Sequence, residues 1–391
     1  MKKIFTILLL FGGLLMSGCS DWLDVQPKDK QSTDMYWESS EDVEAILAQG
    51  YSRLRDCVPY IIDWGELRGS SVIVPVRSTP AGQIQNFTVL PSTSAVQWGT
   101  FYQVIGMANA VLKYAPGVIE KDESYYQSQM DSHLTEAYFL RGLSYLYLVR
   151  NFREVPLITE PYVDDAMPTD VPKSSEVEIL EQIKSDVRAA LATDAAKETF
   201  NGTWATKGRA TKWALYALME TCLWAEDYEE CVTYADYLIN STAPIRPVFM
   251  STPGQWYNMF YPGNSNESIF EIQYDETNYA QGGGSPSKLL PYGSDVTVNT
   301  YMYSEPMTIR LINEFYQNQD EVNRTYYGSF AGKWYYLEIL RVGCSRSGSS
   351  TYNFGCQLYY LSYGRCDVDE SGSFDSYWRF CQLDRSIGYH K

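Results

Sequence analysis

Apolar residues recur every three or four positions along the segment 134–152, which is the period of an amphipathic helix. The stripe consists of Leu134, Ala137, Tyr138, Tyr145 and Leu148. We predict a helix of about five turns here, ending near Phe152 because Pro156 disfavours helical backbone in the residue before it. Gly142 and other small residues of this helix would let a second helix approach closely.

The same period predicts further helices on both sides of this one. They cover residues 41–55, 98–114, 174–195, 210–224, 228–239 and 305–317. Ser39 or Ser40 can cap the first of them, and Ser174 to Glu178 have the sequence of a capping box. The fold class is therefore mostly α, with loop-rich segments between the helices.

The helices expected at 210–224 and 228–239 form the most repeat-like part of the chain. Together they fill roughly the 34-residue period of a tetratricopeptide repeat. Its packing positions would be Tyr228, Cys231, Ala235 and Leu238. Because one repeat cannot bury its own apolar face, this pair needs helical neighbours.

The charge of the chain restricts its partners. The formal net charge is −17 at pH 7, which disfavours binding to nucleic acid or to anionic lipid. Uncharged ligands such as sugars meet no such repulsion. The sequence contains only two histidines, His133 and His390, so most routes to histidine catalysis or to a zinc site are excluded.

The first residues have the pattern of a bacterial lipoprotein signal. Residues 1–18 begin with the positively charged Lys2 and Lys3 and continue with an apolar run, and small residues precede Cys19. We expect cleavage before Cys19, lipidation of that cysteine and a tether over residues 19–37. The alternative is an ordinary secretory signal followed by a cysteine without a role.

The segment 136–157, EAYFLRGLSYLYLVRNFREVPL, resembles the signature EAyFLRAlaYfdLvrlfGdVPL of the SusD/RagB family of outer-membrane nutrient-binding lipoproteins. Arg153 and Glu154 replace the Gly-Asp pair of that signature, a departure at the turn before Val155. The resemblance implies a SusD-like helical domain over residues 38–330, with tetratricopeptide-like helix pairs and small-strand insertions. It also implies a strand at 266–274 and a structural role for Asn109, which would tie down adjacent backbone.

The family resemblance implies binding without chemistry. Such a protein would capture an oligosaccharide or polysaccharide at the cell surface and pass it to a SusC-like TonB-dependent transporter in the outer membrane. No catalytic residue, cofactor or metal is implied. One alternative is a peptide-binding or helical-repeat scaffold lipoprotein. Another is a glycoside hydrolase, which needs two carboxylates roughly 5 to 10 Å apart, and no recognisable signature supplies that pair.

Candidate sugar contacts lie in two loop-rich segments, 59–94 and 244–293. Sugars are held by aromatic faces and by hydrogen bonds from amide or charged side chains. The candidates of this kind are Trp64, Arg68, Arg77, Gln83, Asn86, Tyr279 and Tyr292. Each aromatic candidate has packing as its alternative role, and Trp64 in particular can hold its loop onto the core.

The resemblance stops after about Gly332, and the composition changes there. Four of the eight cysteines lie in this last part of the chain, which could mean two disulfides. We favour a frameshift between about Tyr327 and Asn353, because residues 357–374 can be written with codons that, displaced by one base, encode NFIIYRMADVMLMKAEA. That string resembles the C-terminal helix motif of the family. The segment 331–391 would then be an aberrant tail on a truncated domain.

Overall fold

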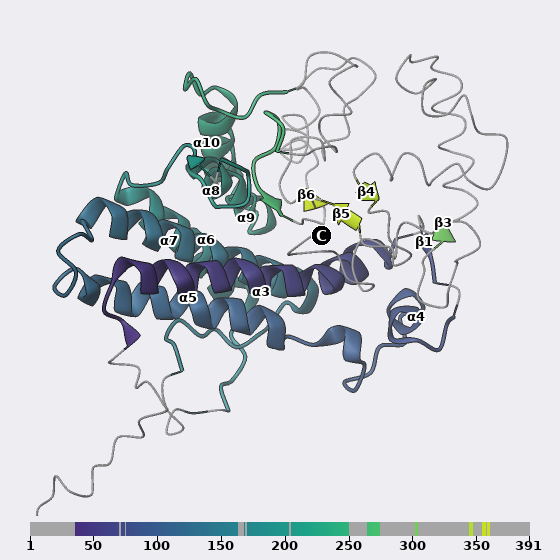
Figure 1. Ribbon diagram of the computed structural model, residues 1–391. Coiled ribbons are helices and arrows are strands. Elements are labelled where there is room, and N and C mark those ends of the chain that lie inside the picture. Colours follow the sequence, from purple (N-terminus) through teal and green to yellow (C-terminus); the bar gives the residue numbers. More distant parts are fainter. Residues whose placement is uncertain are drawn as a thin grey trace, which may run out of the picture.

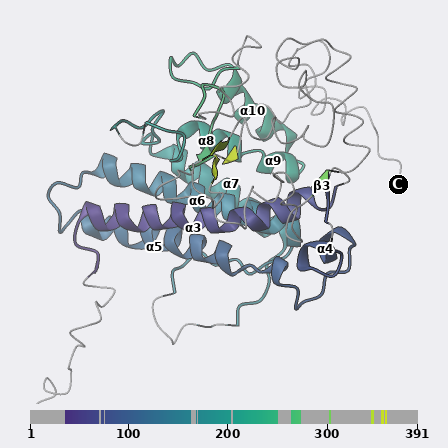
Figure 2. The ribbon, with the colours of Figure 1, turned by 45° about the vertical axis from the view of Figure 1, so that its right-hand side comes forward.

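Four long helices lie side by side in the computed structural model, and a smaller helical group packs over them (Figures 1 and 2). The long helices are α3 (Ser40–Glu66), α5 (Gly99–Val118), α6 (Gln127–Phe152) and α7 (Glu176–Ala192). α5 packs against both α3 and α6, and α6 also packs against α7. The mostly helical fold predicted from periodicity is confirmed.

The structure describes residues 36–69, 72–74, 76–162, 168, 170–202, 205–249 and 264–273, and short strands further along the chain. Several predictions lie outside these residues. They are the signal at 1–18, Cys19, most of the tether, the helix at 305–317 and most of the tail at 331–391. None of the described helices is long and apolar enough to cross a membrane.

α6, the helix predicted from the apolar stripe, is the central helix of the bundle. Most of its residues from Ser132 to Val149 are buried, because α3, α5, α7 and α8 all contact it. The helix begins at Gln127 and is therefore longer than predicted. Its first turns are held by burial of Met130 and by a 2.9 Å hydrogen bond between the Tyr125 hydroxyl and Nδ1 of His133.

α3 continues beyond its predicted end at Arg55, and the expectation that a loop begins at Pro59 is wrong. Proline removes one backbone donor from a helix interior. The helix nevertheless runs through Pro59 to Glu66, because Val58, Ile62 and Trp64 continue its buried face. This extension places the end of α3 beside α4 (Pro80–Gln85) and the short 3-10 helix η3 (Ser94–Val96).

The smaller group is the predicted repeat-like pair. The helix expected at 210–224 is divided into α8 (Lys212–Leu218) and α9 (Thr221–Trp224), and α10 (Tyr228–Ile239) packs against both. The division occurs where the amides of Met219 and Glu220 bond to carbonyls three residues back, at 3.2 Å and 3.0 Å, the tighter 3-10 pattern. α7 supplies the helical neighbour that the pair needs.

Both predicted helix caps are present. Ser39 and Asp42 form a capping box at the start of α3. At α7 the Ser175 side chain accepts from the amide of Glu178, whose carboxylate accepts from the Ser175 amide at 2.8 Å. These bonds satisfy amides that a helix leaves without intrahelical partners.

Buried polar contacts join the helices at fixed points. Arg141 of α6 forms an ion pair of 2.6 Å with Asp186 of α7, and its guanidinium also donates to Oδ1 of Asn109 at 2.8 Å. The Asn109 amide donates to the carbonyl oxygens of Ile158 and Glu160 at 3.0 and 3.3 Å. The structural role predicted for Asn109 is therefore confirmed.

The strands are short and antiparallel. They pair as β1 (Val72–Ile73) with β3 (Met302–Tyr303), β2 (Glu271–Ile272) with β6 (Leu358–Tyr359), and β4 (Cys344–Arg346) with β5 (Phe354–Cys356). The strand expected at 266–274 is limited to β2. Before β2, Ser268 is held by a local contact, the bond from its amide to the Ser265 carbonyl at 3.1 Å.

Candidate functional site

Trp64 lies in the core, and its proposed role as a sugar contact is not supported by this position. Only 3% of the residue is exposed. Its ring stacks on Phe101 at 5.2 Å and meets Phe152 edge-on at 5.1 Å. Its indole nitrogen donates to the carbonyl of Ala95 at 2.7 Å. Since the ring faces and the polar atom are engaged, Trp64 has the packing role that the sequence left open.

The other described candidates follow α3 in the chain, and α4 contacts that helix (Figure 1). Arg68 and Arg77 are exposed on turns before α4, and Gln83 is half-buried within it. Oε1 of Gln83 accepts from the Thr93 hydroxyl at 2.7 Å, which joins α4 to the segment before η3. Tyr279 and Tyr292 lie outside the described residues.

The turn that carries Arg77 is held tightly against α4 by a glycine. A Cβ added at Gly82 would lie 2.4 Å from the carbonyl oxygen of Arg77, closer than any side chain permits. The Thr79 hydroxyl caps α4 by accepting from the Gly82 amide at 3.1 Å. Arg77 is therefore fixed beside the helix that carries Gln83.

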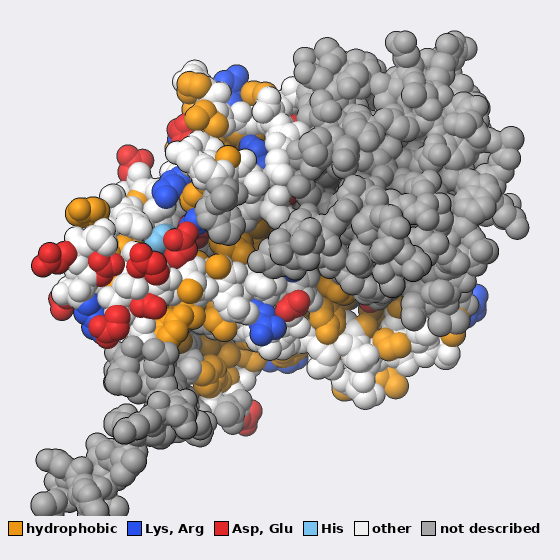
Figure 3. Space-filling view, viewed as in Figure 1, with side chains coloured by type: hydrophobic (Ala, Val, Ile, Leu, Met, Phe, Trp, Pro, Cys, Tyr) orange, Lys and Arg blue, Asp and Glu red, His pale blue; other side chains and the backbone are white. Residues whose placement is uncertain are grey.

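The residues after α4 present apolar side chains that the sequence analysis did not single out. Phe87 is 77% exposed and Leu90 is 55% exposed, with Val89 between them also exposed. Figure 3 shows apolar side chains exposed in the neighbourhood of α4. We call Arg77, Asn86, Phe87, Val89 and Leu90 the α4 surface. The sequence did contain a signal for this surface, because residues 87–90 form the apolar run FTVL within a segment that was expected to be loop.

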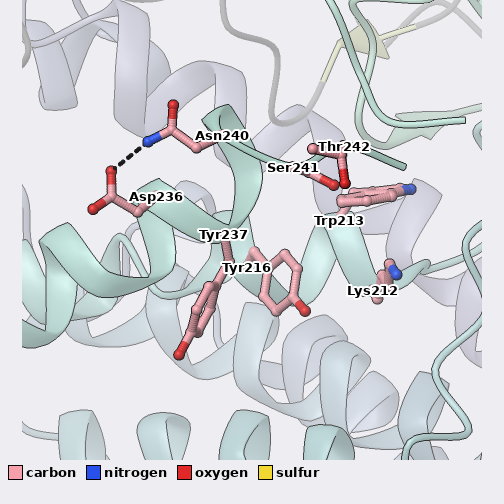
Figure 4. A pocket seen from close by; sticks show the side chains of 8 residues that line it. All are labelled: Lys212, Trp213, Tyr216, Asp236, Tyr237, Asn240, Ser241 and Thr242. Atoms are coloured by element: carbon pink, nitrogen blue, oxygen red, sulfur yellow. Dashed lines mark hydrogen bonds between the residues drawn. The ribbon is translucent and has the colours of Figure 1, made fainter. Parts of the chain in front are cut away.

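A second place of interest is an open hollow between α8 and α10 (Figure 4). Its volume is about 470 Å³, within the range of small-ligand sites. The side chains around it come from the start of α8, the end of α10 and the residues that follow. They are Lys212, Trp213, Tyr216, Asp236, Tyr237, Asn240, Ser241 and Thr242. We call this the α8–α10 hollow.

Aromatic rings form one wall of the α8–α10 hollow. The rings of Tyr216 and Tyr237 lie 5.6 Å apart at 48°. Tyr234 meets Tyr237 edge-on at 5.7 Å, and Trp213 meets Tyr216 at 6.0 Å and 71°. Tyr237 is nevertheless 53% exposed. Sequence analysis missed these tyrosines because periodicity alone assigned them to helix packing.

Polar groups form the rest of the α8–α10 hollow. The Asn240 amide donates to Oδ1 of Asp236 at 3.0 Å, and Ser241 and Thr242 bring hydroxyls. The ammonium of Lys212 is paired with the carboxylate of Glu198. The hollow therefore offers hydrogen-bond donors and acceptors with little net positive charge.

In the described part of the chain, no cluster of three or more His, Cys, Asp or Glu side chains is placed to hold a metal ion. Burial raises the pKa of Glu271 to about 7, the direction expected of a general acid. However, Glu271 is fully buried and both its carboxylate oxygens accept from the Asn264 amide at 2.9 Å. The raised pKa of Glu271 therefore results from the packing of β2 and is not evidence for a general acid.

Comparison with known proteins gives a family match. A sequence profile of a SusD-like family described as "Starch-binding associating with outer membrane" matches residues 21–221, slightly more than half of the chain. A SusD-like protein of Formosa agariphila is 29% identical over 301 residues, 70% of this chain and 55% of that protein. One of Bacteroides ovatus is 26% identical over 53% of this chain and 36% of its own length. The chain spans about half the length of three curated Formosa agariphila relatives that it matches.

Solved structures share the fold. A SusD homolog of Bacteroides thetaiotaomicron superposes with a TM-score of 0.64 at 19% identity, covering 84% of this chain and 75% of its own. A laminarin-binding SusD-like protein superposes with a TM-score of 0.60 at 17% identity, covering 91% of this chain and 82% of its own. At these low sequence identities, the similarity shows a shared fold only.

Proposed function

The chain belongs to the SusD-like family of outer-membrane-associated proteins, and from this membership we propose that it is a cell-surface lipoprotein that captures glycans. Cys19 would carry the lipid anchor, and residues 19–37 would tether the helical domain of residues 38–330. A SusC-like TonB-dependent transporter would receive the bound oligosaccharide or polysaccharide. Binding and release would suffice, without a chemical step.

The single observation that carries this proposal is the family profile match over residues 21–221. The matched stretch includes α3, α5, α6 and α7, the scaffold on which the α4 surface is mounted. The laminarin-binding structural relative supports a saccharide as the ligand. The net charge of −17 supports an uncharged one, and Figure 3 shows acidic side chains gathered at the end of the bundle away from α4.

We place part of the glycan site at the α4 surface, together with Arg68 and Gln83. The exposed ring of Phe87 can lie against the C–H face of a sugar, and the guanidinium of Arg77 can donate to its hydroxyls. Tyr279 and Tyr292, which the sequence analysis proposes as contacts, would add aromatic faces. Loops on a rigid helical scaffold are a frequent place for binding groups.

Affinity electrophoresis of the full chain without its signal residues tests this proposal. A panel of neutral polysaccharides that includes laminarin and starch is cast into the gels. We expect at least one to retard the protein, and Arg77→Ala and Phe87→Ala to reduce that retardation. Tyr126→Ala is the matched control, because Tyr126 is 69% exposed and directly precedes α6, in the connection that follows the C-terminal end of α5.

The same preparation separates the alternatives. Retention on immobilised peptides, with no retardation by any polysaccharide, would favour the peptide-binding scaffold. Release of reducing ends from a polysaccharide would favour the hydrolase. Equal retardation of the wild type, both α4-surface variants and the control would move the glycan site away from α4.

A further inference from the structure

We propose that the α8–α10 hollow is a second saccharide-binding site, selective for uncharged sugar units and separate from the α4 surface. The inference rests on the proposed glycan-binding function and adds a site to it. It comes from the hollow itself, where aromatic rings and hydrogen-bonding groups surround an open space of about 470 Å³. Small-ligand sites span roughly 300 to 1,000 Å³, so one or two sugar rings would be accommodated.

The aromatic wall is ordered by its own neighbours. Tyr237 is exposed yet has contacts with the rings of Tyr216 and Tyr234. Tyr216 in turn contacts Trp213, whose indole nitrogen donates to the Glu198 carbonyl at 3.0 Å. A ring held in this way loses little rotamer freedom when a ligand stacks on it, and such preorganisation favours affinity. A half-exposed tyrosine ring also gives an apolar face and a polar hydroxyl together.

The polar side of the hollow suits the hydroxyl groups of a sugar. Asp236, Tyr237 and Asn240 lie within one turn at the end of α10, and Figure 4 shows the Asp236–Asn240 pair on the same helix as the ring. A carboxylate accepts at both oxygens, and an amide both donates and accepts. The 3.0 Å bond between Asp236 and Asn240 uses one acceptor position and one donor, and it fixes both side chains in place.

The charges of the hollow select against anionic sugars. The Lys212 ammonium is compensated by Glu198, while the Asp236 carboxylate remains at the rim. A sulfate or uronate group placed there would meet a like charge without a compensating cation, which is unfavourable. Neutral glycans avoid that repulsion.

The test compares Tyr237→Ala, Tyr237→Phe and Tyr126→Ala with the wild type. The probe is the neutral polysaccharide of the panel that retards the wild type most, with alginate as the anionic counter-probe. Tyr237→Ala should weaken binding about fivefold or more, because the stacking ring is lost. Tyr237→Phe keeps the ring and should bind within about twofold of the wild type. Tyr126→Ala should match the wild type, and alginate should retard none of the proteins.

The outcomes distinguish this inference from the proposed function. If Phe87→Ala weakens binding while Tyr237→Ala binds like the wild type, the second site is overturned and glycan binding stands. If no neutral polysaccharide retards the wild type, both are overturned. Stronger retardation by alginate than by any neutral polysaccharide overturns the stated selectivity. Because Tyr237 is half-exposed, circular dichroism of the alanine variant should be unchanged, and a lost helical signal would instead assign Tyr237 a folding role.

Discussion

At the residue scale, Arg153 occupies a turn whose backbone conformation favours glycine. Its φ and ψ angles are 63° and −62°, and the Glu154 amide donates to the Phe152 carbonyl at 2.7 Å. This is a γ-turn with positive φ, a strained conformation for residues that carry a Cβ. The resembling family signature has glycine at this position. The sequence identified this departure, and the structure shows that the arginine adopts a positive φ there.

We expect Arg153→Gly to be more stable than Arg153→Ala by about 1 kcal/mol. Glycine relieves the Cβ strain of the turn, whereas alanine keeps it. Both variants lose the exposed ion pair with Glu176, which is worth at most about 1 kcal/mol. Urea unfolding of the two variants measures the difference. An alanine variant as stable as the glycine variant would show that the turn carries no strain.

The packing of whole helices depends on glycines at their crossing points. A Cβ added at Gly142 of α6 would lie 3.0 Å from Cδ2 of Leu218 in α8 and 3.4 Å from Cγ2 of Ile183 in α7. The sequence prediction that small residues of this helix allow a close neighbour is therefore confirmed. Gly50 likewise lets α3 approach α6 closely. A Cβ added at Gly50 would lie 3.0 Å from Cδ1 of Leu140.

Gly142→Leu should destabilise the fold by about 1 to 3 kcal/mol, the usual penalty for forcing extra methylene groups into a packed core. Gly106→Leu is the matched control on α5. Nothing lies within 4 Å of a Cβ at Gly106, so this change should be neutral or stabilising through the higher helix propensity of leucine. Thermal unfolding of both variants decides the point. Equal losses would mean that the tight crossing at Gly142 does not limit the packing.

At the scale of the whole molecule, buried polar groups join segments that are far apart in sequence. Arg209 forms ion pairs with Glu136 of α6 at 2.6 Å and with Glu44 of α3 at 3.0 Å. The Tyr51 hydroxyl donates to Glu136 at 2.7 Å. In the same region the amide of Glu271 donates to the Lys207 carbonyl at 2.9 Å, which brings β2 to the segment before α8.

The stability of the molecule should fall as pH rises from about 4.5 to about 7 through the titration of Glu271. Burial raises the pKa of this carboxyl from 4.5 to about 7, so the folded state binds its proton more tightly than the unfolded state does. The favourable difference is complete below the unfolded pKa and is lost as pH rises through the folded pKa. With about 1.4 kcal/mol per pKa unit, the change is roughly 3 kcal/mol.

Glu271→Gln tests this dependence, because glutamine cannot ionise. Chemical unfolding at several values between pH 4.5 and pH 8 should show the variant gaining stability relative to the wild type as pH rises. His133, whose pKa is lowered by burial, has the opposite dependence. The wild type and Glu271→Gln share this dependence, so it cancels when their free energies of unfolding are compared. Parallel stability curves would mean that the Glu271 carboxyl titrates normally.

Part of the candidate site could be predicted from the sequence. Arg77 lies directly before α4 and Gln83 lies within it, since the two are close in sequence, and Arg68 is exposed on the turn that follows α3. Trp64 could not be assigned, because its exposure depends on whether α3 stops at Pro59 or continues to bury its face against Phe101 and Phe152. The exposure of Phe87 was equally undetermined, since an apolar run alone does not tell which side chains find a neighbour.

The sequence by itself determined where the long helices lie, although not where α3 ends or where α6 begins. Local periodicity places α5, α6, α7 and α10, and a nearby serine and acidic residue cap α7, because these features depend on residues within a few positions of one another. Only the tertiary structure decided that Tyr216 and Tyr237 share a hollow, that Trp64 is buried and that the pKa of Glu271 is raised. Each of these depends on which distant segments meet, and the hydrophobic pattern of a helix shows that a face is buried without identifying the partner that buries it.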